Sequence, residues 1–148
     1  MATTSPGLSR EVKAGGALNG PAVLLGRVLF GLIFLLSGLN HFSKHTIEFA
    51  ASQGVPLASL AVPASGIIAL AGGLSILLGY RARIGAWMIV LFLVPVTFAL
   101  HKFWGIADPA IAQNQMVHFM KNLSMLGGAL LMTQFGSGPL SLDSRSPR

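Results

Sequence analysis

The sequence predicts an all-α membrane protein, a bundle of four transmembrane helices with both termini in the cytoplasm. Two observations give the fold class. Hydrophobic residues make up 53% of the 148 residues and charged residues 9%, which is far from the balance of a soluble domain. Four apolar runs of about the length that crosses a bilayer follow one another, separated by short polar segments. At this length the runs form one compact unit.

The basic character of the chain does not indicate a nucleic-acid partner. The formal net charge is +6 and the isoelectric point is about 11.0. A nucleic-acid-binding domain gathers Lys and Arg on one face, whereas here they lie between apolar runs. The chain has no cysteine, which excludes disulfides, thiolate metal sites, iron–sulfur ligation and dithiol chemistry within it.

The first span is expected at residues 22–42, after a tail at 1–20 that is rich in small residues and lacks an apolar period, as disordered segments do. A signal peptide is the alternative, because basic residues precede the apolar run. The run argues against it because it contains Arg27, lacks a convincing small-residue cleavage site, and is followed by further spans. Arg27–Lys44 therefore reads as an apolar helix with a charge at its start and a polar cluster at its end.

The second and third spans are expected at 57–79 and 84–101, joined by a tight polar hairpin at 79–83. Residues 50–56 have the composition of a turn. Small residues recur at every fourth position of the second span and predict close helix packing; they are Ala61, Ser65, Ala69 and Gly73. Pro95 predicts a kink in the third span.

The fourth span is expected at 116–135, in a helix that begins near Pro109. Asp108 is a good N-cap, and proline suits the first helical position. The membrane domain is then 21–136, and residues 137–148 are expected to form a second disordered tail.

The distribution of basic residues predicts the orientation. Four spans place both termini and the 79–83 hairpin on one side, and that side holds Arg10, Lys13, Arg27, Arg81, Arg83, Arg145 and Arg148. The opposite side holds only Lys44, Lys102 and Lys121. Because positive residues are retained inside, the first side is predicted to be cytoplasmic. The lipid bilayer is thus the expected surroundings, in the cytoplasmic membrane.

This topology brings polar side chains together near the outer face. They are Asn40, His41, Lys44, His45, Glu48, His101, Lys102, His118, Lys121 and Asn122. Helical spacing puts Phe34, Gly38, His41 and His45 on one face of the first helix, and His118, Asn122 and Met125 on one face of the fourth. If these faces turn inward, they form a polar pocket just below the outer interface. Ionisable groups at membrane depth are candidates for function, because burying them costs free energy. The structural alternative is that the lysines snorkel and the histidines merely mark the water boundary.

At this point the chain resembles the DoxX family of small four-helix membrane proteins, over roughly residues 25–143. The resemblance rests on order and spacing, and its residues are Arg27, Phe30, Gly31, Gly38, His41, Lys44, Gly54, Val55, Pro56, Gly72, Gly73, Leu77, Leu78, Gly79, Arg81, Arg83, His101, Asn122, Gly127 and Gly128. It implies a bacterial-type cytoplasmic membrane location. It also implies a relation to redox systems, because some members are similar to the membrane subunit of a thiosulfate:quinone oxidoreductase and others are associated with oxidative-stress complexes.

The leading functional hypothesis is a quinone-linked or redox-associated membrane subunit. The expected proton-exchanging, catalytic residues are His41, His101 and His118, because histidine titrates near neutral pH. The expected ligand-binding residues are Lys44, Lys102 and Asn122. Arg27 is expected to be an anchor or a helix-pairing residue. No side chain of this chain carries electrons, so a partner subunit or the ligand must do so.

Three alternatives remain. The first is a non-enzymatic scaffold or carrier that holds a lipid or a small hydrophobic molecule and docks a larger partner. The second is bis-histidine haem ligation by His41 with His101 or His118, at an edge where haem is exposed. The third is a metal site from His41 and His45, with Glu48 as the nearby carboxylate. The sequence gives no positive sign of metal or haem, and homo-oligomerisation and enzymatic activity stay open.

Overall fold

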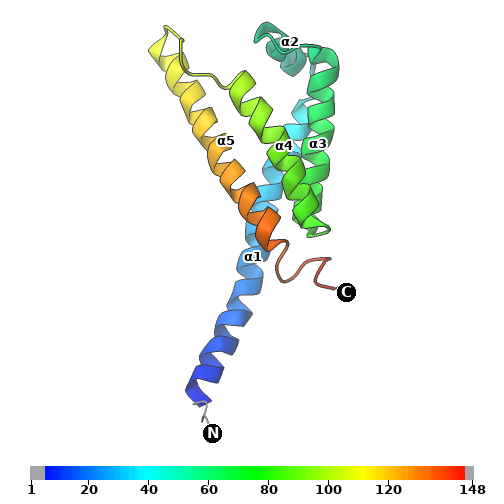
Figure 1. The fold of residues 1–148 in the computed structure, drawn as a ribbon, viewed down its shortest axis with the longest axis vertical. Coiled ribbons are helices and arrows are strands. Elements are labelled where there is room, and N and C mark those ends of the chain that lie inside the picture. The colour runs from blue at the N-terminus through cyan, green and yellow to red at the C-terminus, as the bar shows by residue number, and fades with distance from the viewer. Residues whose placement is uncertain (1–5, 146–148) are drawn as a thin grey trace.

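A computed structural model describes the backbone of residues 6–145 and the side chains of residues 20–145. Within that part the chain forms five helices and no strand (Figure 1). The helices are α1 (Pro6–Asn40), α2 (Lys44–Ser52), α3 (Ala58–Leu78), α4 (Ala82–Leu100) and α5 (Pro109–Phe135). The prediction of an all-α protein is therefore confirmed.

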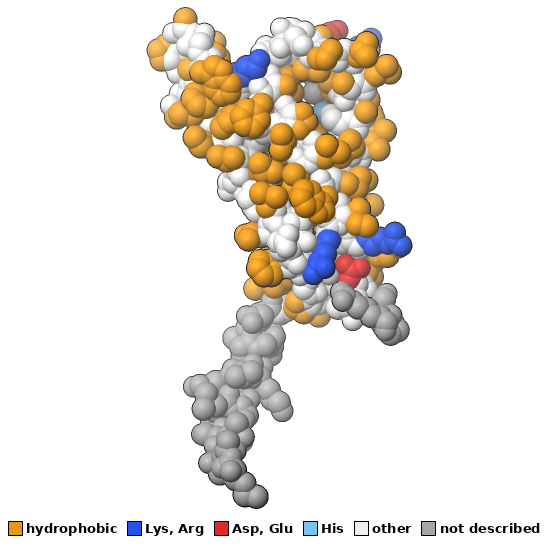
Figure 2. Space-filling view, in the orientation of Figure 1, with side chains coloured by type: hydrophobic (Ala, Val, Ile, Leu, Met, Phe, Trp, Pro, Cys, Tyr) orange, Lys and Arg blue, Asp and Glu red, His pale blue; other side chains and the backbone are white. Residues whose placement is uncertain are grey.

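Three helices of the described part are long and apolar enough to cross a membrane. They are the segment Gly20–Asn40 of α1, and α3 and α4 over their full lengths. The predicted spans 22–42, 57–79 and 84–101 agree with these segments to within about two residues at each end. α5 has 27 residues but does not reach the same apolar character, so a fourth span stays a prediction. Apolar side chains cover the middle of the face in Figure 2, and Lys and Arg lie near its ends.

The helices pack in the order α1, α3, α4, α5, and α2 lies against α3. The largest fully buried side chains of the core are Phe34, Ile76, Ile89 and Leu93, which come from α1, α3 and α4. In Figure 1, α5 leans against the lower part of α4 and diverges from it toward the end that carries α2. We call that end the distal end. The opposite end, with the α3–α4 turn and the C-terminal segment, is the terminal end.

Glycines set the close approach of α1 to α3. A methyl group at Gly31 would meet the carbonyl oxygen of Gly73 at 2.8 Å, and one at Gly66 would meet the carbonyl oxygen of Gly38 at 2.9 Å. Because such distances leave no room for a side chain, only glycine permits the two backbones to pack this tightly. The predicted small-residue stripe is partly correct: Ala69 and Gly73 are buried, but Ala61 is exposed, and Gly66 was not included in it.

The structure contains one helix that the sequence did not predict. α1 ends at Asn40, and Ser43 caps α2 by accepting a hydrogen bond from the Thr46 amide at 3.2 Å. His45 therefore lies on α2, and the prediction that it shares a face of the first helix with His41 is wrong. The predicted start of the last helix is confirmed, since Asp108 accepts hydrogen bonds from the amides of residues 110 and 111 at 2.8 and 3.1 Å.

The chain ends differ from the predicted tails. α1 begins at Pro6, inside the segment 1–20, whereas residues 1–5 and 146–148 lie outside the described residues. Residues 137–145 pack against the helices instead of forming the predicted disordered tail. The reason is a set of hydrogen bonds: Arg27 donates to the carbonyl oxygens of Ser137 and Leu140 at 3.0 and 2.6 Å, and the amides of Leu142 and Asp143 donate to the end of α3.

Candidate functional site

A cavity of about 270 Å³ lies at the distal end between α1, α4 and α5, with α2 beside it. We call it the distal cavity. Its apolar wall includes Phe34, Phe92, Val96 and Met125. Its polar lining consists of Ser37, Asn40, His41, Thr46, His101, Lys121 and Asn122. Half of the ten polar residues that the sequence placed near the outer face line this cavity: Asn40, His41, His101, Lys121 and Asn122.

His41 is held rigidly at the wall of this cavity. Only 7% of its surface is exposed, and Nδ1 lies 2.7 Å from the carbonyl oxygen of Ser37. A carbonyl only accepts hydrogen bonds, so Nδ1 carries the proton and donates it. The ring packs edge-to-face on Phe92, with the centroids 5.4 Å apart. This arrangement leaves Nε2 as the ring nitrogen that can meet a ligand.

Asn122 is the most unusual polar group of the cavity. Its side chain is only 5% exposed, yet its amide has no hydrogen-bond partner among residues 20–145. The amide atoms are accessible from the cavity, because the side-chain polar atom that is fully enclosed without a partner among residues 20–145 is Arg27 Nε. The amide lines the distal cavity, where a bound molecule can supply the missing partner.

A second polar cluster joins the cavity to the surface. His101, which lines the cavity, stacks on His118 with ring centroids 5.2 Å apart. His101 Nδ1 is 3.0 Å from Gln115 Oε1, and His118 Nδ1 is 3.2 Å from Lys121 Nζ. Because a protonated lysine only donates, His118 accepts at Nδ1 and its ring is neutral in this arrangement.

The structure brings together only part of the predicted site. His41, His101 and Asn122 line the cavity, and His118 lies one ring behind it. The other two predicted ligand-binding residues, Lys44 and Lys102, are exposed and do not line it.

The sequence reasoning missed the α4 side of the cavity. Phe92 contacts His41, and Val96 and Leu100 follow it at helical spacing ahead of His101. That spacing is the signal that could have identified this wall. Gln115, the partner of His101, was also missed.

An apolar cavity of about 200 Å³ adjoins the first one. It lies between α2, α3 and α4 and shares His41, Val96 and Leu100 with the distal cavity. Ala50, Val62 and other small or apolar side chains form most of its wall. The described residues contain no group of three or more histidine or acidic side chains placed to hold a metal ion. Of the pair considered from the sequence, His41 lies in the turn after α1 and His45 lies on α2.

Comparison with known proteins places the chain in a family. Residues 22–102, more than half of the chain, match the DoxX family. The inner membrane protein YphA of Escherichia coli is 29% identical over 132 residues, which cover 88% of this chain and 94% of that protein. The inner membrane protein YqjF of the same organism is 30% identical over 128 residues, or 85% of this chain and 92% of that protein.

A more distant relative is the ER-derived vesicles protein ERV29 of Saccharomyces cerevisiae. It is 25% identical over 129 residues, which cover 84% of this chain but only 41% of that protein. No solved structure matches the chain. The family match, the bacterial relatives and the three span-length helices agree with one another: this chain belongs to the DoxX family and is a multi-pass protein of the inner membrane.

Proposed function

We propose that the chain is a quinone-linked membrane subunit whose distal cavity binds the quinone ring. The observation that carries the proposal is the buried, unpartnered amide of Asn122, which faces an otherwise largely apolar cavity beside His41. A quinone offers an apolar ring and two carbonyl acceptors, which is the complement of this lining.

The size of the cavity supports a single ring. An apolar cavity of about 150 Å³ holds benzene, and the distal cavity measures about 270 Å³. The ring faces of Phe34 and Phe92 offer aromatic contact, which contributes about 0.5–1.5 kcal/mol beyond burial. A substituted ring fits in this volume, and an isoprenoid tail must then extend into the bilayer.

The polar groups suit both binding and proton exchange. The Asn122 amide can donate to a quinone carbonyl, and His41 Nε2 can donate when the ring is protonated or accept from a hydroxyl when it is neutral. His101, His118 and Lys121 extend from the cavity to the exposed surface, so they provide a route for protons to the outer water. Reduction to the quinol requires two electrons and two protons, and the electrons must come from a partner subunit.

The proposal includes the full topology: α5 as a fourth span over 116–135 and both termini in the cytoplasm. The excess of Lys and Arg at the terminal end supports this orientation. Because the chain has no cysteine, single-cysteine labelling can test it. Arg145→Cys should react with an impermeant maleimide only in inverted vesicles, and Ala107→Cys only in intact cells. Labelling of both from the same side would contradict four spans.

Mass spectrometry of solvent extracts tests the ligand. The full chain is purified in native membrane patches, in parallel with Asn122→Leu and with a His41→Ala, His101→Ala double variant. Quinone should be enriched in the wild type and lost from both variants. Lys44→Ala is the matched control, since Lys44 is exposed and outside the lining. Equal quinone in all four samples would refute the proposed site.

The second candidate is a carrier or scaffold without enzymatic activity, which holds a lipid or another hydrophobic molecule. The adjoining apolar cavity favours it, because that cavity offers space for a hydrocarbon chain and few polar groups. In this case the extracts should contain an acyl lipid in place of quinone. Val62→Trp, which fills the apolar cavity, should remove that lipid, whereas under the quinone proposal it should leave quinone retention unchanged.

A further inference from the structure

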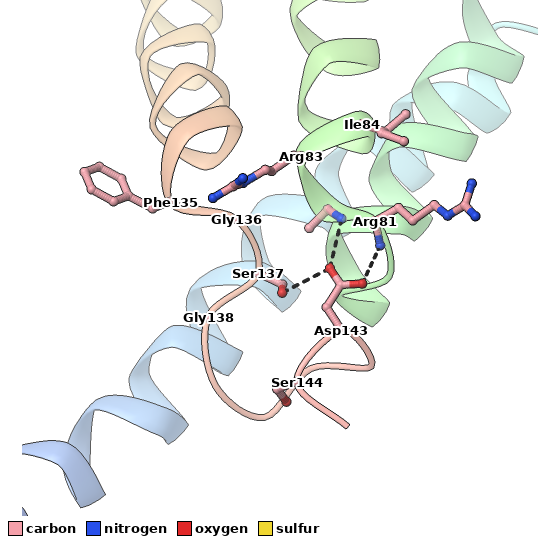
Figure 3. Close-up of a pocket in the computed structure, with 10 residues that line it drawn as sticks. Arg81, Arg83, Ile84, Phe135, Gly136, Ser137, Gly138, Asp143 and Ser144 are labelled. Atoms are coloured by element: carbon pink, nitrogen blue, oxygen red, sulfur yellow. Dashed lines mark hydrogen bonds between the residues drawn. The ribbon is translucent and has the colours of Figure 1, made fainter. Parts of the chain in front are cut away.

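A second large cavity, of about 620 Å³, lies at the terminal end, far from the site described above. It is enclosed by the start of α4, the end of α5 and the C-terminal segment (Figure 3). We call it the terminal cavity. Its lining combines Arg81 and Arg83 with serine hydroxyls and with the apolar side chains of Ile84 and Phe135.

The wall formed by the C-terminal segment is fixed by hydrogen bonds. The Asp143 carboxylate accepts from the amides of Arg81 and Ala82 at 2.9 and 3.3 Å and from the Ser137 hydroxyl at 3.2 Å. The Asp143 amide donates to the carbonyl oxygen of Gly79 at 2.9 Å. The carboxylate therefore caps α4, and the start of that helix is not available to a ligand.

Arg83 is the cation that this arrangement leaves for a ligand. Its side chain is exposed and makes no hydrogen bond, ion pair or ring contact with any residue in the range 20–145. Figure 3 shows it reaching from α4 toward the end of α5, beside Phe135 and Gly136. The side chain of Arg81 points the other way, and its guanidinium lies 5.6 Å from the centroid of the Tyr80 ring.

Charge and apolar surface meet at this cavity. Ile84 and Phe135 are 56% and 78% exposed; Ile84 lies in the first turn of α4, which is long and apolar enough to cross a membrane, and Phe135 is the last residue of α5. A soluble anion gains nothing from contact with these apolar side chains. A phospholipid is complementary to both features, because its phosphate pairs with a cation and its acyl chains pack on an apolar surface. Basic pockets between helices at a membrane face are typical binding sites for acidic lipid headgroups.

We propose that the terminal cavity binds an anionic phospholipid, with its phosphate on Arg83 and its acyl chains along Ile84 and Phe135. A guanidinium suits this task because its planar fork pairs with two phosphate oxygens. The nearby Asp143 carboxylate opposes anion binding, but its oxygens are engaged by three donors and its charge is opposed by Arg27. This site is independent of the distal cavity and of quinone.

Lipid retention by the full chain provides the test. The protein is extracted from vesicles with equal amounts of phosphatidylglycerol and phosphatidylcholine, and the lipids that stay bound are quantified by mass spectrometry. The wild type should retain phosphatidylglycerol at least fivefold over phosphatidylcholine, and Arg83→Gln should bring the ratio close to one. Arg145→Gln is the matched control, since it removes an exposed arginine charge that lies in the C-terminal segment but does not line the cavity.

Each other outcome overturns the proposal. An equal fall of the ratio in Arg83→Gln and Arg145→Gln would mean general charge attraction. Displacement of phosphatidylglycerol by millimolar inorganic phosphate would mean a site for free anions. Phe135→Ser keeps Arg83 and alters only an exposed side chain, so this variant should fold. It should also lower the ratio of phosphatidylglycerol to phosphatidylcholine, and an unchanged ratio would show that Phe135 does not contribute to lipid binding. Quinone retention reports on the other site and should not change in any of these variants.

Discussion

Arg27 and Asn122 are buried to nearly the same degree at opposite ends of the molecule, but their side chains differ in the hydrogen bonds that they make. Arg27 is 3% exposed and Asn122 is 5% exposed. Both terminal nitrogens of the Arg27 guanidinium donate to carbonyl oxygens of the C-terminal segment, and only Nε lacks a partner. Asn122 has no partner in the described part of the chain. The two residues differ in where their polar atoms lie: Arg27 Nε is fully enclosed without a partner, whereas the Asn122 amide is accessible from the distal cavity.

The terminal end is organised around the Arg27 guanidinium. A side chain at Gly79 would overlap Arg27 Nη1 and Ser141, so glycine is required where α3 ends. Gly79 also has a φ of 65°, which glycine adopts without strain. Among residues 20–145, no comparable network of hydrogen bonds crosses the distal cavity. We therefore expect substitutions at the terminal end to change stability and substitutions around Asn122 to change binding.

The largest expected effect is the loss of the C-terminal segment. Deleting residues 137–148 removes the two carbonyl acceptors of Arg27 and the cap of α4. Hydrogen bonds to a charged group contribute about 1.5–3 kcal/mol each, so the loss of the two bonds should lower the free energy of unfolding by about 3–6 kcal/mol. Unfolding by denaturant in detergent micelles measures the change.

A second background separates this cause from a general effect of truncation. In an Arg27→Met chain the same deletion removes no hydrogen bond to a charged group, so it should cost much less than in the wild type. An equal cost in both backgrounds would show that Arg27 is not what the segment stabilises.

The next largest effect concerns the α1–α3 contact beside the distal cavity. In Gly66→Val the first carbon of the new side chain would already lie 2.7 Å from the His41 Cβ. Such overpacking costs about 1–3 kcal/mol and should displace His41, which lowers quinone retention. Gly127→Val is the control, because a side chain at Gly127 meets nothing within 4 Å. Similar losses in both variants would exclude the close approach as the cause.

Asn122→Leu should have a smaller effect on stability. The amide makes no hydrogen bond to residues 20–145 and is accessible from the cavity, so its replacement should change the unfolding free energy of the ligand-free protein by less than about 1 kcal/mol. In membranes that supply the ligand the wild type should become the more stable protein, because only the wild type binds it. A loss of stability as large as that from deleting the C-terminal segment would show that the amide is structural.

The smallest effects are expected at the lysines of the distal end. Lys44 is exposed on α2, and its replacement by alanine should change stability by less than about 0.5 kcal/mol and leave ligand retention unchanged. Lys121→Met should be equally mild for stability but should weaken ligand binding, because Lys121 lines the cavity and holds His118. Equal retention in both variants would remove Lys121 from the site.

The sequence predicts the apolar helices and part of the site because their signals are local. Hydropathy locates α3 and α4, Asp108 marks the start of α5, and helical spacing brings Asn122 to the cavity together with Met125. The C-terminal segment escapes prediction for a physical reason. Its composition is that of a tail, and what orders it is hydrogen bonding between its backbone carbonyls and an arginine 110 and 113 residues earlier in the chain.

The distal cavity was only half predicted because its α4 wall is apolar. Phe92 carries no polar signal, and its contact with His41 depends on how α1 and α4 pack around α3. α2 was missed because its composition is that of a turn and a polar helix end, although it has a serine cap. Because of α2, His45 does not continue the first helix and does not line the cavity.

Binding of a short-chain, water-soluble quinone to the purified full chain in nanodiscs tests the central claim most directly. Calorimetric titration of the wild type should show saturable binding at one site. Asn122→Leu should bind at least tenfold more weakly while unfolding at a similar temperature, and Lys44→Ala should match the wild type. Equal affinity in the wild type and in a folded Asn122→Leu protein would contradict the assignment of the distal cavity as the quinone site.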